Sequence, residues 1–304
     1  MPSETITLAA LDGRPLAATI HSPEGPPRAA LVVLGALGVP RRYYASFAAS
    51  LTGRGVAVLT FDYRGNAGSR TVPLRKDPAT LLDWAQLDAS AAIDLALARW
   101  GEVPVWGLGH SFGGQAIGLS PRGLDLAGAI VVAAGSGDLD LYPPALRRRF
   151  RVGLGVLLPL LSATLGYVPG RVGVGQDLPS GVMRQWARWC LTPDYARGAL
   201  GRDATFFHRI TAPMFFYDFT DDTYAPARPS AALRGWYERA QVTHKTIAPA
   251  DLGVAAIGHF GGFRSGLAEP VWREIADAVL GEPRPLHPRP DREQPASDAP
   301  AYTP

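Results

Sequence analysis

A serine between two glycines is the residue of this chain best suited to covalent chemistry. Residues 109–113 read Gly-His-Ser-Phe-Gly, a G-x-S-x-G pattern at the end of an apolar run. In a nucleophile elbow a strand turns sharply into a helix and holds a serine at the tip, and the glycines leave room for the turn. A strand at Val103–Leu108 and a helix from Gln115 supply that context. The pattern predicts a nucleophilic Ser111, and the alternative is an ordinary strand–helix turn.

A serine at neutral pH needs a base, and among the six histidines we favour His259. It follows the last expected strand and precedes the closing helix, so a loop can present its imidazole to Ser111. The alternative is a helix-capping or buried histidine. His110 adjoins the serine, so its side chain should point away, and His244 begins a strand at the wrong end of the sheet. The others are His21 in the opening strand, His208 in a connection and His287 in the tail.

The carboxylate that orients the base should follow the strand expected at Pro213–Tyr217. Asp218, Asp221 and Asp222 are the candidates. Asp218 is close to strand register, so we expect its side chain to face away. We favour Asp222, which lies at the turn, with Asp221 as the alternative or as a cap of the same turn.

Acyl transfer also needs N–H donors for the developing oxyanion. The N–H of Phe112, just after the serine, is one candidate. The second should come from the loop after the strand Ala30–Leu34. There we favour Leu37, with Ala36 as the alternative.

The elements that must position these residues alternate between strands and helices. Continuous apolar runs are typical of strands buried on both faces, and the alternation implies an α/β fold with a mostly parallel central sheet flanked by helices. An opening hairpin is expected at Thr5–Leu8 and Leu16–His21, and helices at Tyr43–Leu51 and Ala79–Trp100. The buried strands are expected at Ala30–Leu34, Gly55–Phe61, Val103–Leu108, Ala129–Ala134, Pro213–Tyr217 and Thr243–Ala248.

The alternation breaks between Ser136 and Thr211, where no convincing strand occurs. We interpret this segment as a helical cap over the carboxyl ends of the strands, where α/β proteins bind ligands. The chain would then comprise core residues 1–135, a cap at 136–211, core residues 212–280 and a tail at 281–304. The Pro-rich composition of the tail predicts disorder.

An apolar cluster in the cap would form a roof over Ser111 and favour apolar acyl groups. From the cap we take Leu157, Leu160 and Trp186 as candidate substrate contacts. Trp186 could instead anchor the cap together with Trp189, which shares its helix face. The roof comprises Leu154, Val156, Leu157, Leu160 and Leu161.

Composition excludes several classes of function. The net charge of the 304 residues is only +3, and the basic residues are scattered, which argues against nucleic-acid binding. The single Cys190 excludes an internal disulfide and a thiolate metal cluster. Residues 1–10 lack the features of a signal peptide, which predicts a cytoplasmic protein. Val152–Val168 is apolar but falls short of the ~20 residues that span a bilayer, so membrane contact is not expected.

Taken together, these features resemble the α/β-hydrolase superfamily, in particular its serine aminopeptidase/monoglyceride-lipase-like group, whose members share the order Ser, Asp, His. Residues 35–38, Gly-Ala-Leu-Gly, stand where that group usually has His-Gly-x-Gly. Residues 61–69 resemble its D-x-R-G-x-G-x-S segment with a shifted glycine, and Phe219 takes the glycine slot of G-x-x-D. The resemblance covers about residues 5–280. It implies the α/β-hydrolase fold, with Asp62 and Arg64 tying loops near the site.

The resemblance also implies a serine hydrolase acting on a small-molecule ester or related acyl compound, with no cofactor and no metal. An acyltransferase with the same three side chains is the alternative. A nucleotide-binding protein is disfavoured because the glycines at 107, 109 and 113 do not match a Rossmann loop and no G-K-[ST] occurs. A complete Ser-Asp-His set disfavours a non-enzymatic scaffold.

Overall fold

A central eight-stranded sheet carries the fold of the computed structural model, which describes residues 2–173 and 175–281. The predicted tail beyond Gly281, with His287, lies outside the described residues. The strand order is β1-β2-β4-β3-β5-β6-β9-β10. Strands β4, β3, β5, β6, β9 and β10 run parallel, whereas β1 pairs antiparallel with β2 and β2 with β4. The strands are β1 (Ser3–Ala9), β2 (Pro15–His21), β3 (Ala29–Leu34), β4 (Val56–Phe61), β5 (Val105–His110), β6 (Gly128–Val132), β9 (Met214–Phe219) and β10 (Val242–Ile247).

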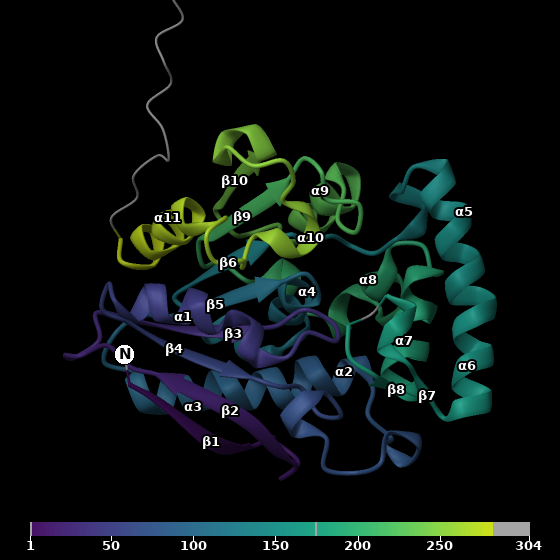
Figure 1. Cartoon of the computed structure of the whole chain (residues 1–304), viewed down its shortest axis with the longest axis horizontal. Coiled ribbons are helices and arrows are strands. Elements are labelled where there is room, and N and C mark those ends of the chain that lie inside the picture. Colours follow the sequence, from purple (N-terminus) through teal and green to yellow (C-terminus); the bar gives the residue numbers. More distant parts are fainter. Residues whose placement is uncertain (1, 174, 282–304) are drawn as a thin grey trace, which may run out of the picture.

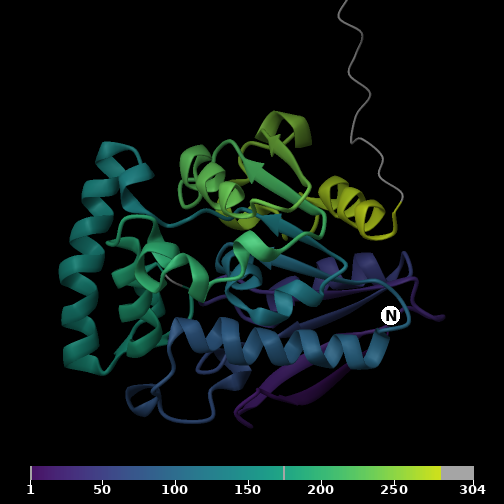
Figure 2. The ribbon, with the colours of Figure 1, turned by 180° about the vertical axis from the view of Figure 1, so that it is seen from behind.

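Helices cover both faces of this sheet (Figures 1 and 2). Helices α1 and α11 pack on one face, and α3, α4 and α9 on the other. The two faces have separate hydrophobic cores, because β3, β4 and β5 are buried on both sides. The predicted mostly parallel sheet flanked by helices is thus confirmed. The helices are α1 (Ala45–Thr52), α3 (Ser90–Trp100), α4 (Phe112–Leu119), α9 (Ala227–Trp236), α10 (Gly258–Gly261) and α11 (Glu269–Val279).

The long helix expected at Ala79–Trp100 is continuous but not uniform. It consists of α2 (Leu81–Asp83), a π-helical stretch at Trp84–Ala89, and α3. Thr80 and Asp83 form a capping box at its start, since each side chain accepts from the other's backbone N–H.

The segment between β6 and β9 stands at the end of the sheet toward which β5 points (Figure 1). Helices α5 and α6 are joined by a π-helical turn at Gly153–Leu157, so that they form one long outer helix. The expectation of no strand here was wrong, since β7 and β8 form a short antiparallel ladder. Two residues per strand are too few for an alternating pattern. The elements are α5 (Pro144–Val152), α6 (Leu158–Leu165), β7 (Tyr167–Val168), β8 (Leu178–Pro179), α7 (Ser180–Cys190) and α8 (Tyr195–Leu200).

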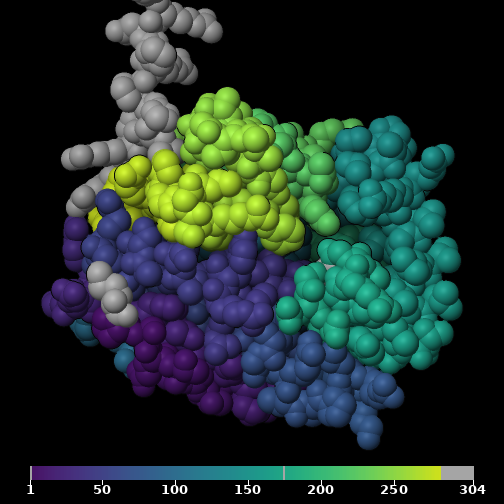
Figure 3. Space-filling model, in the orientation of Figure 1, coloured from purple at the N-terminus to yellow at the C-terminus, as the bar shows by residue number. Residues whose placement is uncertain are grey.

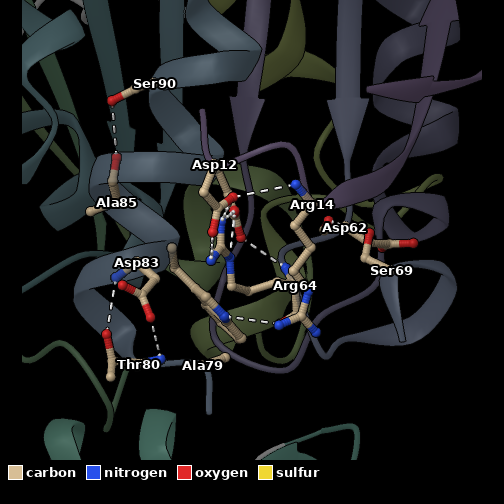
Figure 4. A network of polar contacts seen from close by, with 12 residues as sticks. Asp12, Arg14, Asp62, Arg64, Ser69, Ala79, Thr80, Asp83, Ala85 and Ser90 are labelled. Carbon is tan, nitrogen blue, oxygen red and sulfur yellow. Dashed lines mark hydrogen bonds and ion pairs between the residues drawn. The ribbon is translucent and has the colours of Figure 1, made fainter. Parts of the chain in front are cut away.

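A network of ion pairs ties the loop after β4 to the opening hairpin and to the π-helical stretch (Figure 4). The Arg64 guanidinium lies between Asp12, at 2.8 Å, and the buried Asp88, at 2.7 Å. Burial raises the pKa of Asp88 to about 6, against the opposing effect of Arg64. Asp62 accepts hydrogen bonds from the backbone N–H groups of Arg41 and Gly68. The Asp62 and Arg64 side chains therefore both join loops, as the resemblance implies.

Within the described part of the chain, no helix has both the length and the apolar character needed to cross a bilayer.

Candidate active site

The turn between β5 and α4 has the geometry of a nucleophile elbow. Ser111 adopts φ 53° and ψ −114°, a conformation that non-glycine residues rarely adopt. A Cβ atom at Gly109 would lie 2.4 Å from the Gly113 carbonyl carbon, and one at Gly113 would lie 1.8 Å from the Leu34 carbonyl oxygen. Only glycine fits at either position, so these two residues permit the strained turn at Ser111.

The three residues favoured for catalysis come together at this elbow. Ser111 Oγ lies 2.9 Å from His259 Nε2, and His259 Nδ1 lies 2.8 Å from Asp222 Oδ2. The other Asp222 oxygen accepts hydrogen bonds from the N–H groups of Tyr224 and Ala225, which fix the carboxylate. With its Nδ1 proton donated to Asp222, His259 presents a lone pair on Nε2 to the serine hydroxyl.

The other two aspartates after β9 have different partners. Asp221 Oδ2 accepts from the backbone N–H groups of Ile257 and Gly258, at 2.8 and 3.0 Å, and so holds the loop that carries His259. Asp218 bonds Ser230, Arg234 and His244 instead. Of the three candidates, Asp222 alone contacts the imidazole of His259.

The loop after β3 leaves one of its two candidate N–H groups free. The Ala36 N–H donates to Tyr44 Oη at 2.9 Å. For the Leu37 N–H, no acceptor occurs among the residues that the structure describes. The N–H of Phe112 is at the first position of α4, where no carbonyl within the helix can accept its hydrogen bond. Leu37 and Phe112 therefore retain donors for a ligand, and Ala36 does not.

A small pocket of about 70 Å³ opens beside Ser111, between the core and the helices inserted between β6 and β9. The space-filling view shows a recess between the green C-terminal elements and the teal inserted ones (Figure 3). Apolar and aromatic residues form most of the lining, and Gln115 supplies its one amide. The lining residues are Ser111, Gln115, Gly135, Gly137, Leu139, Tyr142, Phe150, Leu154, Trp186, Cys190, Tyr224 and Ala225.

The sequence is similar to that of a known hydrolase family. The family described as serine aminopeptidase, S33, matches residues 25–183. The chain belongs to this hydrolase family. The predicted resemblance to that group of α/β-hydrolases is therefore confirmed. No protein of curated function matches the hydrolase in sequence.

Solved structures resemble the hydrolase over most of its length. A thermostable carboxyl esterase from Bacillus coagulans is 13% identical with a TM-score of 0.63, covering 92% of this chain and 99% of that one. A monoacylglycerol lipase from Paleococcus ferrophilus is 16% identical with a TM-score of 0.57, covering 88% and 99%. Est1E from Butyrivibrio proteoclasticus is 16% identical with a TM-score of 0.57, covering 91% and 98%. At these identities the likeness shows the α/β-hydrolase fold.

In the structure, the side chains predicted to form the apolar roof do not all face the pocket. Trp186 lines the pocket, whereas Leu157 and Leu160 do not and are 48% and 57% exposed. The reason is helical periodicity, because the inward face of this helix carries Leu154 and Leu158, four residues apart. Leu157 and Leu160 fall outside this inward face and are exposed to solvent.

Several pocket residues of the hydrolase were missed at the level of sequence. The spacing of four between Phe150 and Leu154, and between Trp186 and Cys190, is the signal that could have found them. Cys190 is buried there, and burial raises the pKa of its thiol. Tyr142 and Tyr224 lie in loops, and their contact, in which the Tyr142 hydroxyl donates to the Tyr224 carbonyl, has no sequence signal.

Proposed function

We propose that this hydrolase cleaves carboxylic esters of short apolar acids through an acyl-enzyme on Ser111. One observation carries the proposal, namely the continuous hydrogen-bonded series from Ser111 Oγ through His259 to Asp222. Such a series supplies a nucleophile, its general base and the group that orients the base.

The reaction follows from these contacts. As Ser111 Oγ attacks the ester carbonyl carbon, His259 Nε2 takes the hydroxyl proton, and Asp222 stabilises the resulting imidazolium. The N–H groups of Leu37 and Phe112 bind the oxyanion of the tetrahedral intermediate. His259 then gives its proton to the departing alkoxide, which leaves the acyl group on Ser111. A water that loses its proton to His259 attacks the acyl carbonyl, and Ser111 departs with that proton.

The pocket supports an acyl group that is small and apolar. A space of about 10–15 Å³ holds one water-sized group, so about 70 Å³ accepts only a few heavy atoms. The Gln115 amide is already bonded, since its Nε2 donates to the Gly135 carbonyl and its Oε1 accepts from the Tyr195 hydroxyl. One donor and one acceptor of this amide are thus occupied, so a polar acyl group would lose its hydration in exchange for few partners.

Labelling tests the nucleophile directly. We expect a fluorophosphonate probe to modify the folded protein once, because the base beside Ser111 activates its hydroxyl. Mass spectrometry should find the adduct on the peptide that contains Ser111. Heat-denatured protein and Ser111→Ala are the controls, and neither should react. A folded wild-type protein that stays unlabelled would contradict the proposed function.

The acyl preference is tested with p-nitrophenyl esters of graded chain length. Because the pocket is small, kcat/KM should be greatest for acetate to butyrate esters and should fall for octanoate. Leu154→Ala should shift this optimum to longer acyl chains, since it enlarges the pocket. Leu157→Ala is the matched control from the same helix, and its exposed side chain predicts an unchanged profile. An equal shift in both variants would show that the lining does not select the acyl group.

A further inference from the structure

Two buried side chains outside this mechanism join the oxyanion loop to the loop that carries the base. Tyr44 follows the loop after β3, and His110 precedes the nucleophile; both are essentially inaccessible to solvent. Tyr44 Oη lies 2.9 Å from the Ala36 nitrogen and 2.9 Å from His110 Nδ1. His110 Nε2 in turn lies 3.0 Å from the backbone carbonyl oxygen of His259.

The donors and acceptors of this bridge allow a single arrangement. The Ala36 N–H donates to Tyr44 Oη, so the tyrosine hydroxyl proton is free to donate to His110 Nδ1. His110 must then carry its proton on Nε2, which donates to the carbonyl of His259. Burial, reinforced by the nearby His259, lowers the pKa of His110 to about 3, so it is neutral at physiological pH. Every polar atom of the bridge is thereby satisfied.

Packing fixes the two rings of the bridge. The Phe263 ring packs edge-on against Tyr44, with centroids 5.0 Å apart, and packs at a tilt against His110, with centroids 4.9 Å apart. On the other side a Cβ atom at Gly35 would approach a Tyr44 ring carbon to 3.2 Å, closer than ordinary contact. The glycine that replaces the usual histidine of the oxyanion loop thus leaves room for the tyrosine ring.

We propose that Tyr44 and His110 act as one positioning unit, which sets the oxyanion loop and the backbone of His259 relative to Ser111. The inference rests on the proposed function and adds to it two residues that do not touch the reacting atoms. Removing the bridge would release the Ala36 N–H and with it the adjacent N–H of Leu37. The acyl pocket would not change, because neither Tyr44 nor His110 lines it.

The test is Tyr44→Phe, which removes one hydroxyl and keeps the ring. We expect kcat for a short ester to fall about 10- to 100-fold, since losing an oxyanion donor altogether costs about 10²- to 10³-fold. KM should stay within about twofold. Tyr217→Phe is the matched control: its buried hydroxyl donates to Glu274, away from the site, so kcat should not change. An unchanged kcat in Tyr44→Phe, or a loss confined to KM, would overturn the inference.

A double-mutant cycle tests whether the two residues act together. His110→Phe alone should lower kcat, and the double variant should be little worse than the poorer single variant, because each breaks the same bridge. Effects that multiply would refute a single unit. If His110→Phe does not fold, the positioning role is tested by the rate at which a fluorophosphonate inactivates Tyr44→Phe. A rate equal to that of the wild-type protein would refute the inference. Ser111→Ala separates the two proposals. If this variant kept full activity, the proposed function itself would be refuted.

Discussion

Ser111→Ala is expected to lower kcat for ester hydrolysis by about 10⁶-fold, the loss typical of removing the nucleophile from a serine triad. His259 would then have no hydroxyl to deprotonate, and no acyl-enzyme could form. The remaining rate would come from the N–H donors and the pocket alone. Steady-state assays with p-nitrophenyl acetate, on protein purified in the same way as wild type, measure the change.

The folded structure should survive this substitution. Ser111 holds its strained φ of 53° because the turn imposes it, and alanine meets the same strain. Among the residues that the structure describes, the Ser111 hydroxyl bonds only His259, so the thermal unfolding midpoint should move by a few degrees at most. A variant that keeps more than a tenth of wild-type kcat would place the nucleophile elsewhere, whereas a variant that fails to fold would leave the labelling experiment to decide.

The fold and the elbow could be predicted because their signals are local. Apolar runs mark β3, β4 and β5, and the glycines at 109 and 113 are needed within a single turn. The ends of the predicted strands differ from the observed ones by at most two residues, which is the usual uncertainty of such boundaries.

The remaining features depend on contacts between distant segments. The spacing of four between Phe150 and Leu154 marks one face of their helix, but which face turns inward becomes clear only where the helix packs on the core. The bridge from Ala36 through Tyr44 and His110 joins segments up to 149 positions apart, so no spacing rule could find it. The choice between the two aspartates after β9 is of the same kind, because adjacent residues in a turn point in different directions.

The second large effect on kcat is expected at the aspartate that orients His259. Asp222→Asn is expected to lower kcat by about 10⁴-fold, as neutralising the triad acid does in serine proteases. An asparagine NH₂ facing His259 Nδ1 would favour the tautomer with its proton on Nε2, which cannot accept from Ser111. The imidazolium that forms during attack would also lose its counter-charge. KM should change little, because Asp222 does not line the pocket.

Asp221→Asn is the matched control at the neighbouring position, with the same loss of one charge. Its remaining carbonyl oxygen can still accept from the N–H groups of Ile257 and Gly258, so we expect less than a tenfold loss of kcat. Asp221→Ala removes that acceptor and should be worse than Asp221→Asn, since it frees the loop that carries His259. The ranking Asp222→Asn, then Asp221→Ala, then Asp221→Asn is therefore the expected order of decreasing damage. If Asp221→Asn were the more damaging of the two asparagine variants, the acid that orients the base would be Asp221, and the loop would have to rearrange before catalysis.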